Sequence, residues 1–204
     1  MAIVEFDGFL TVVLACLVSY IFGALPFAHR LSSRKGIDIF STGTGLAGAS
    51  NVFRSVGKGS ALLVLVFDVA KGALAVIVSA MMGVEGIMLL LPAVVAVFGH
   101  WNSVFTRFKG GDGMAIGGGV AIGLFGIVAV LAFLVAVLVG LLAQRLPFSS
   151  LFSIVGGYLT LYLMSYGNSE QSNVALGFGA VVVLILIHAM LGHRRRKQAF
   201  TKIG

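Results

Sequence analysis

Charged residues are scarce in this sequence, which has 204 residues, 10% of them charged and 59% hydrophobic. A soluble domain carries roughly 25% charged residues, so the composition excludes an ordinary soluble fold. Cysteine is almost absent as well, and the single Cys16 has no partner for an intramolecular disulfide. No His, Cys and carboxylate residues have the spacing of metal ligands, so we expect no metal and no other cofactor.

Long apolar runs dominate the chain, and each approaches the length that crosses ~30 Å of hydrocarbon. Without water to bind backbone groups, such runs must be helical. The charge-free stretch from Gly113 to Gln144 would be about 48 Å long as one helix, so a break near Gly123–Gly126 is predicted. The sequence predicts an all-α polytopic membrane protein, one integral membrane domain over 1–204. About seven transmembrane helices are expected, over 9–27, 60–82, 84–99, 113–124, 126–144, 150–166 and 174–192.

The charged residues divide between the two sides of this arrangement. Basic residues lie in loops 28–58, 100–112 and 145–149 and in the tail 193–204, whereas the remaining gaps hold only acids. With seven crossings every basic segment faces the cytoplasm, as the positive-inside rule favours. The N-terminus is therefore expected outside and the C-terminus in the cytoplasm. The net charge of +7 is interpreted as a topological signal facing anionic lipid, and no nucleic acid partner is expected.

Residues 41–54 form a polar, glycine-rich segment that ends at Arg54. Glycines allow backbone N–H groups to approach a ligand, and successive N–H groups form anion-binding nests. A helix starting near Ala49 would add positive potential, and Arg54 is suited to a bidentate phosphate contact. A flexible loop followed by a helix cap explains the same residues, so both interpretations stay open.

A second polar segment runs from His100 to Gly113 and contains Lys109-Gly110-Gly111-Asp112. A Lys-Gly-Gly turn entering a helix is again suited to an anion, although a histidine at a helix end is more often a structural hydrogen-bonding group. The tail 193–197 is basic and is most simply a lipid contact. Together the segments place several anion-binding groups at one membrane face, which favours a phosphate-bearing substrate with a lipid tail.

Asp68 and Lys71 lie inside the run 60–82 and are three residues apart, so they share one helix face. Charged groups inside a membrane are costly and usually pair with each other or face a polar cavity. We favour an internal, structural ion pair over a catalytic pair.

The sequence resembles a known family, the bacterial acyl-phosphate:glycerol-3-phosphate acyltransferases, over nearly its whole length. The segment Tyr20–Phe27 resembles the family's Tyr-Leu-x-Gly-Ser-Ile-Pro-Phe, and Gly43–Val52 resembles Gly-Ser-Gly-Asn-x-Gly-Ala-Thr-Asn-Val. The other matching motifs follow in family order: Arg54, Gly57-Lys58, Asp68–Gly72, Gly99-His100, Phe108–Gly113 and His193-Arg194.

The resemblance implies a seven-helix enzyme of the bacterial inner membrane, with its active site on the cytoplasmic side. Such enzymes transfer a fatty acyl group from acyl phosphate to the hydroxyl of glycerol-3-phosphate, giving lysophosphatidic acid and phosphate. No metal or classical base is implied, because the leaving phosphate is proposed to assist deprotonation. The partners expected are these two substrates and membrane lipid, and the protein is expected to be a monomer.

Site residues are carried over by position. Thr44 takes the place of the loop serine that contacts acyl phosphate, Arg54 that of the phosphate-binding arginine and His100 that of the loop histidine; these three are the expected catalytic residues. The expected substrate-binding residues are Gly43, Gly45, Gly48, Asn51, Lys109, Gly110, Gly111, Asp112, Ser153, His193 and Arg196.

Two departures from the family pattern keep three hypotheses open. Leu46 replaces an asparagine, and Asp112 replaces a lysine that binds phosphate. At ~4 Å and an effective dielectric of ~20, the interaction between the charge at position 112 and one charge of a bound phosphate is about 4 kcal/mol. Arg196, at the site of the family's tail asparagine, is a candidate to restore the lost charge. The chain is thus an acyltransferase of the family type, a related enzyme with another acceptor, or a non-catalytic protein that binds lipid or anions.

Overall fold

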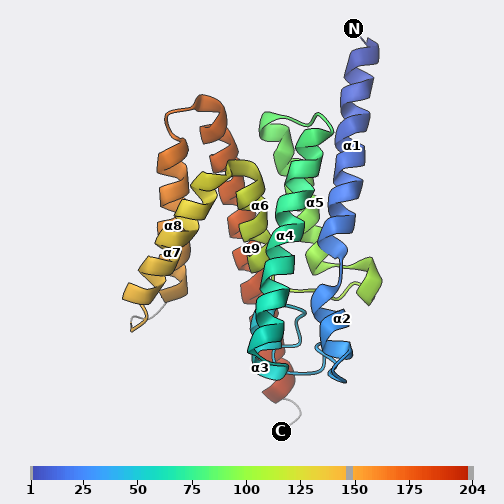
Figure 1. Ribbon diagram of the computed structural model, residues 1–204, viewed down its shortest axis with the longest axis vertical. Coiled ribbons are helices and arrows are strands. Elements are labelled where there is room, and N and C mark those ends of the chain that lie inside the picture. Colours follow the sequence, from blue (N-terminus) through green and yellow to red (C-terminus); the bar gives the residue numbers. More distant parts are fainter. Residues whose placement is uncertain (1, 146–148, 202–204) are drawn as a thin grey trace.

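The computed structural model describes residues 2–145 and 149–201, and describes the side chains of 8–145 and 151–190. Every regular element in these ranges is helical, which confirms the predicted all-α class (Figure 1). The α-helices are α1 Ala2–Ala24, α2 Phe27–Ser33, α3 Ala49–Ser55, α4 Lys58–Met81, α5 Leu90–Trp101, α6 Met114–Phe125, α7 Ile127–Leu142, α8 Ser149–Ser165 and α9 Ser169–Thr201, with 3-10 helices η1 Gly86–Leu89 and η2 Val104–Thr106.

In the described part of the chain, four helical segments are long and apolar enough to cross a membrane: Gly8–Ser33, Lys58–Met81, Gly86–Thr106 and Ser169–Met190. The shorter apolar helices are α6, α7 and the segment Leu151–Ser165 of α8. The four long segments and the three shorter helices correspond to the seven apolar runs of the sequence. The chain is an integral membrane protein.

Two chain breaks follow from single residues. Gly126 separates α6 from α7 with φ 57° and ψ −127°, a conformation that a side chain would strain, so the break falls where the sequence predicts it. Pro26 separates α1 from α2, because proline has no backbone N–H to continue the helical ladder. At this second break, the carbonyl oxygen of Leu25 is available to accept a hydrogen bond from a buried side chain, Lys71.

Helices α4 and α6 approach each other closely through glycines. A Cβ atom on Gly119 would lie 2.0 Å from the carbonyl oxygen of Val69, and one on Gly72 would lie 2.3 Å from that of Ile116. Small residues allow such backbone contact, which gives helices in a membrane the van der Waals packing that holds them together.

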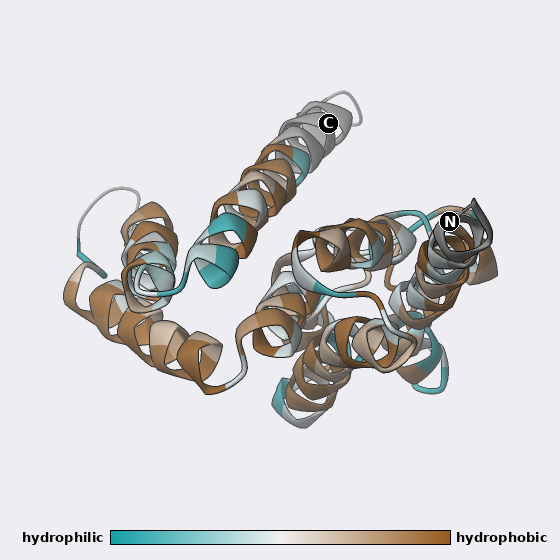
Figure 2. Ribbon diagram, turned by 90° about the horizontal axis from the view of Figure 1, so that it is seen from above, coloured by the Kyte–Doolittle hydropathy of each residue, from teal (hydrophilic) through white to brown (hydrophobic). Residues whose placement is uncertain are grey.

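Much of the helical ribbon is hydrophobic, as the brown colour in Figure 2 shows. Large side chains such as Leu62, Phe67, Leu134 and Leu163 are exposed on several helices. An aqueous surface rarely carries so much contiguous apolar area, whereas a lipid-facing surface requires it.

The glycine-rich segment between α2 and α3 is anchored, not free. Ile39 and Val52 are fully buried in a small apolar cluster with Ala28, Ala47 and Val64. This cluster holds the segment against α4 at the end of the molecule where α9 also ends (Figure 1). Apolar contacts thus hold this segment on α4, and helix α3 begins at Ala49 near where the sequence predicts it.

Candidate active site

Asn51 organises the first loop, residues 39–48. Its side-chain nitrogen donates to the carbonyl oxygens of Ile39, Thr42 and Leu46 at 2.9–3.0 Å. Its oxygen accepts the backbone N–H of Thr44 at 3.0 Å. The sequence predicted Asn51 as a substrate ligand, but the side chain is 1% exposed and binds the loop itself. Its geometry is that of a residue that shapes the loop.

The second loop, residues 102–113, is fixed to α1 and to the first loop. Ser103 Oγ donates to the carbonyl oxygen of Ala24 at 2.5 Å, and Thr106 Oγ1 donates to that of Lys109. The N–H of Ala47 donates to the carbonyl oxygen of Gly110 at 3.0 Å. This last bond, which we call the loop junction, joins the two glycine-rich loops that the sequence singled out separately.

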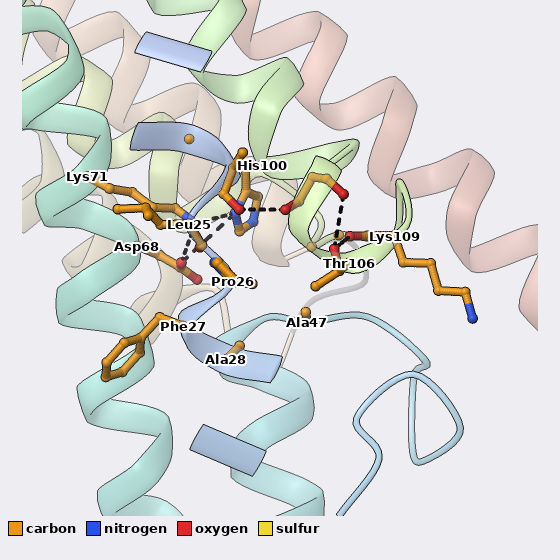
Figure 3. A pocket seen from close by; sticks show the side chains of 15 residues that line it. Leu25, Pro26, Phe27, Ala28, Ala47, Asp68, Lys71, His100, Thr106 and Lys109 are labelled. Atoms are coloured by element: carbon orange, nitrogen blue, oxygen red, sulfur yellow. Dashed lines mark hydrogen bonds and ion pairs between the residues drawn. The ribbon is translucent and has the colours of Figure 1, made fainter. Parts of the chain in front are cut away.

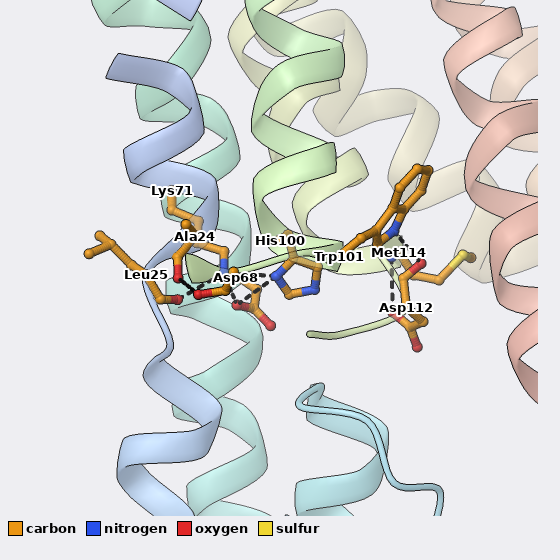
Figure 4. Close-up of polar contacts among 9 residues, drawn as sticks. Ala24, Leu25, Asp68, Lys71, His100, Trp101, Asp112 and Met114 are labelled. Atoms are coloured by element: carbon orange, nitrogen blue, oxygen red, sulfur yellow. Dashed lines mark hydrogen bonds and ion pairs between the residues drawn. The ribbon is translucent and has the colours of Figure 1, made fainter. Parts of the chain in front are cut away.

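Three buried ionisable side chains meet beside the loop junction, where Pro26 interrupts the first transmembrane segment. Lys71 Nζ lies 2.9 Å from Asp68 Oδ1 and 2.8 Å from His100 Nδ1. Lys71 also donates to the carbonyl oxygen of Leu25 at 3.2 Å. The contact predicted between Asp68 and Lys71 is present, and His100 joins it from α5 (Figure 4).

These groups line a small open pocket, with about 250 Å³ of empty space including its open side, together with Ala47 and Lys109 (Figure 3). Asp68 Oδ2 is buried there and has no hydrogen-bond partner among the described residues. Charged groups at this depth are costly unless they pair or face a polar space, and this cluster does both.

Asp112 lies at the end of the second loop, two residues before α6 begins at Met114. Its Oδ1 accepts the backbone N–H of Met114 at 3.0 Å, and its carbonyl oxygen accepts the Nε1–H of Trp101 at 3.1 Å. A carboxylate at a helix N-terminus is favoured by the unpaired N–H groups there. Local structure therefore accounts for the acid, although the carboxylate oxygens lie only 3.9–4.0 Å from the point where a Cβ of Gly48 would be.

The two cations predicted at the loops are exposed. Arg54 is on α3, and Lys109 lies over the ring of Phe40 with 5.6 Å between Nζ and the ring centroid. Gly43 and Gly45 have φ angles of 58° and 68°, which favour glycine at these two positions, whereas Gly48 precedes α3 with an extended backbone.

The hydrogen bond of Ser153 is made within the helices and not to the loops. Its Oγ donates to the carbonyl oxygen of Ala136 on α7 at 2.5 Å. The side chains of His193 and Arg196 lie outside the described residues, although the backbone there belongs to α9. No group of three or more potential metal ligands exists among the described side chains.

Sequence reasoning missed His188, whose ring on α9 stacks on Trp101 with 4.2 Å between centroids. A lone histidine in an apolar run was the available signal, because polar residues within a membrane segment usually mark a site.

A large apolar groove starts at α6, directly after the second loop. It has about 1530 Å³ of empty space, including its open side, and is bounded by α4, α6, α7, α8 and α9. Met114 lines its wall, and the N–H of the same residue binds the Asp112 carboxylate. The polar loops and the apolar groove are therefore contiguous.

Fold and site together define an integral membrane protein in which polar loops at one end of a helical scaffold adjoin an apolar groove. The model of the family "Glycerol-3-phosphate acyltransferase" matches residues 13–201. The chain belongs to this family.

Curated relatives carry the same name. Glycerol-3-phosphate acyltransferase 1 of Deinococcus radiodurans is 41% identical over 150 residues, covering 74% of each chain. The Thermus thermophilus enzyme is 38% identical over 188 residues, covering 92% of this chain and 93% of its own. The crystal structure of PlsY (YgiH), an integral membrane glycerol 3-phosphate acyltransferase in its glycerol 3-phosphate form, is similar with a TM-score of 0.72. It shares 26% identity with this chain and covers 94% of this chain and 92% of that one.

Proposed function

We propose that this protein transfers a fatty acyl group from acyl phosphate to the hydroxyl of glycerol-3-phosphate. The bond between the acyl carbon and the phosphate oxygen breaks, and a bond between that carbon and the glycerol oxygen forms. The proton of the hydroxyl leaves with the phosphate, so the products are lysophosphatidic acid and inorganic phosphate. The protein's task is then to hold two substrates in a reactive geometry.

The observation that carries this proposal is the loop junction between Ala47 and Gly110. It brings two glycine-rich loops together, and the exposed Arg54 on α3 and Lys109 in the second loop supply positive charge. Glycine-rich backbone and basic side chains are the groups that bind phosphate in proteins. Thr44, His100, Arg54 and the glycines of both loops are accordingly the proposed catalytic and binding residues.

The apolar groove is proposed to hold the acyl chain. It begins at Met114, next to the Asp112 end of the second loop, so a phosphate at the loops would place its acyl chain at the groove entrance. A pocket lined by apolar side chains gains free energy from each buried methylene, about 0.8 kcal/mol.

We further propose seven crossings, with the N-terminus outside and the loops in the cytoplasm of a bacterium. The start of α1 and the end of α9 lie at opposite ends of the molecule in Figure 1, which supports an odd number of crossings. The basic loops lie at the α9 end, in keeping with the positive-inside rule. A monomer suffices, because both loops come from one chain.

The test is the release of phosphate from palmitoyl phosphate by the purified protein, with and without glycerol-3-phosphate. Lysophosphatidic acid is identified by mass spectrometry. Acyl transfer that depends on glycerol-3-phosphate is expected, and no lysophosphatidic acid from a folded sample would refute the proposal. Asp112→Asn and Asp112→Lys form a graded series of charge at one position.

A second candidate, a neutral acceptor, is favoured only by the Asp112 carboxylate beside Gly48. That charge would repel a phosphate but would accept a hydrogen bond from a polyol hydroxyl. Activity with glycerol-3-phosphate in Asp112→Lys but not in the wild type, together with wild-type activity toward glycerol, would establish this candidate.

A further inference from the structure

Lys71 is surrounded by three acceptors. Its Nζ atom lies 2.9 Å from Asp68 Oδ1, 3.2 Å from the carbonyl oxygen of Leu25 and 2.8 Å from His100 Nδ1. An ammonium group has three hydrogens and no lone pair, so each acceptor receives one hydrogen. His100 Nδ1 must then present its lone pair to Lys71.

We propose that Lys71 is a positioning residue that fixes the tautomer of His100, with the proton on Nε2. A neutral imidazole has one donor nitrogen and one acceptor nitrogen, so occupying Nδ1 as an acceptor leaves Nε2 as the donor. Asp68 acts through Lys71 by balancing its charge. The distance of 3.9 Å between Asp68 Oδ1 and His100 Nδ1 is too long for a direct hydrogen bond.

The Nε2 atom lies at the loop junction. A Cβ atom on Gly111 would be 2.2 Å from His100 Nε2 and 2.9 Å from the carbonyl oxygen of Ala47. In Figure 4 the ring lies between the Asp68–Lys71 pair on one side and the Asp112 end of the second loop on the other. On the proposed function, on which this consequence rests, the tautomer provides a fixed N–H donor for a substrate oxygen held by the loops.

A purely structural ion pair would explain the same contacts differently. Lys71 links α4 to the Leu25 carbonyl and to α5, and such a link would hold the helices together even if the His100 tautomer had no role in the reaction. A neutral Lys71 amine that accepts a hydrogen bond from Nδ1–H would require the opposite tautomer. The protonation of the two ring nitrogens therefore separates a Lys71 ammonium from a neutral amine, and the effect of Lys71→Met on kcat separates a positioning role from a purely structural one.

The decisive experiment is ¹⁵N NMR of the full chain in lipid nanodiscs, with ring-labelled histidine. The chain has 4 histidines, and comparison with His100→Gln assigns the His100 signals. We expect an unprotonated Nδ1 and a protonated Nε2 in the wild type. A protonated Nδ1 overturns the proposal. This measurement uses no substrate, so its result is independent of whether the proposed reaction occurs.

Lys71→Met then removes the ammonium group while keeping an unbranched side chain. We expect a mixture of His100 tautomers and a roughly tenfold to hundredfold lower kcat in palmitoyl phosphate turnover, with KM less affected. Lys71→Arg retains a donor and should preserve the wild-type spectrum. Lys58→Met makes the same change at the exposed start of the same helix and should alter neither. An unchanged His100 spectrum in folded Lys71→Met contradicts the proposal, and the wild-type spectrum decides it if that variant does not fold.

Discussion

Gly111 lies directly against His100, so that a Cβ atom on Gly111 would be 2.2 Å from Nε2 of the ring. The second loop therefore requires glycine here because of the neighbouring ring, and not because of its backbone angles. This contact ties the position of the ring to the path of the loop.

Gly111→Ala should therefore displace either the ring or the loop. We expect roughly a hundredfold loss of acyl transfer, because small misplacements of reacting groups are that costly. Gly36→Ala is a control in the exposed turn after α2, where nothing lies within 4 Å but φ is +71°, so it tests backbone strain without a ring contact. Full activity in Gly111→Ala would mean that the ring has no fixed place in the reaction.

Asn51→Asp should disorder the first loop while hardly changing side-chain size. The variant loses the N–H donors to Ile39, Thr42 and Leu46 and leaves carbonyl oxygens unpaired, at about 1–3 kcal/mol for a buried group. Hydrogen exchange of residues 39–48 should accelerate. Asn168→Asp keeps the acceptor that caps α9 and should exchange as the wild type does. Unchanged exchange in Asn51→Asp would show that the loop does not depend on this side chain.

Gly119→Ala should destabilise the helix bundle, because its Cβ would lie 2.0 Å from the Val69 carbonyl oxygen on α4. Overpacking of this kind costs about 1–3 kcal/mol. The adjacent Gly118→Ala meets nothing within 4 Å and should leave Tm equal or higher. Thermal unfolding in one detergent measures both variants. Equal Tm values would mean that α4 and α6 are not in backbone contact.

Gly118→Phe should shorten the acyl chain that the enzyme accepts, since Gly118 lines the apolar groove. We expect kcat/KM for palmitoyl phosphate to fall about tenfold more than that for octanoyl phosphate, because each methylene excluded from the groove forfeits about 0.8 kcal/mol. Gly8→Phe makes the same change on α1, where nothing lies within 4 Å, and should not alter the chain-length profile. A uniform loss across chain lengths would place the acyl chain elsewhere.

Much of this protein was determined locally by the sequence. The apolar runs became the apolar helices because the helical backbone satisfies its own hydrogen bonds wherever water is absent. Gly126 ended α6 through its own φ angle, and Asp68 met Lys71 because residues three apart share a helix face. The glycine-rich composition of the first loop was also visible in the sequence.

Contacts between distant segments were decided only by the tertiary structure. His100 reaches Lys71 across 29 positions of sequence, and Ala47 meets the second loop at Gly110. Asn51 turned out to bind its own loop, and Ser153 binds α7. None of these contacts follows from periodicity or motif, because they depend on the angle and distance at which whole helices pack. In this membrane protein, small residues such as Gly72 and Gly119 set that distance.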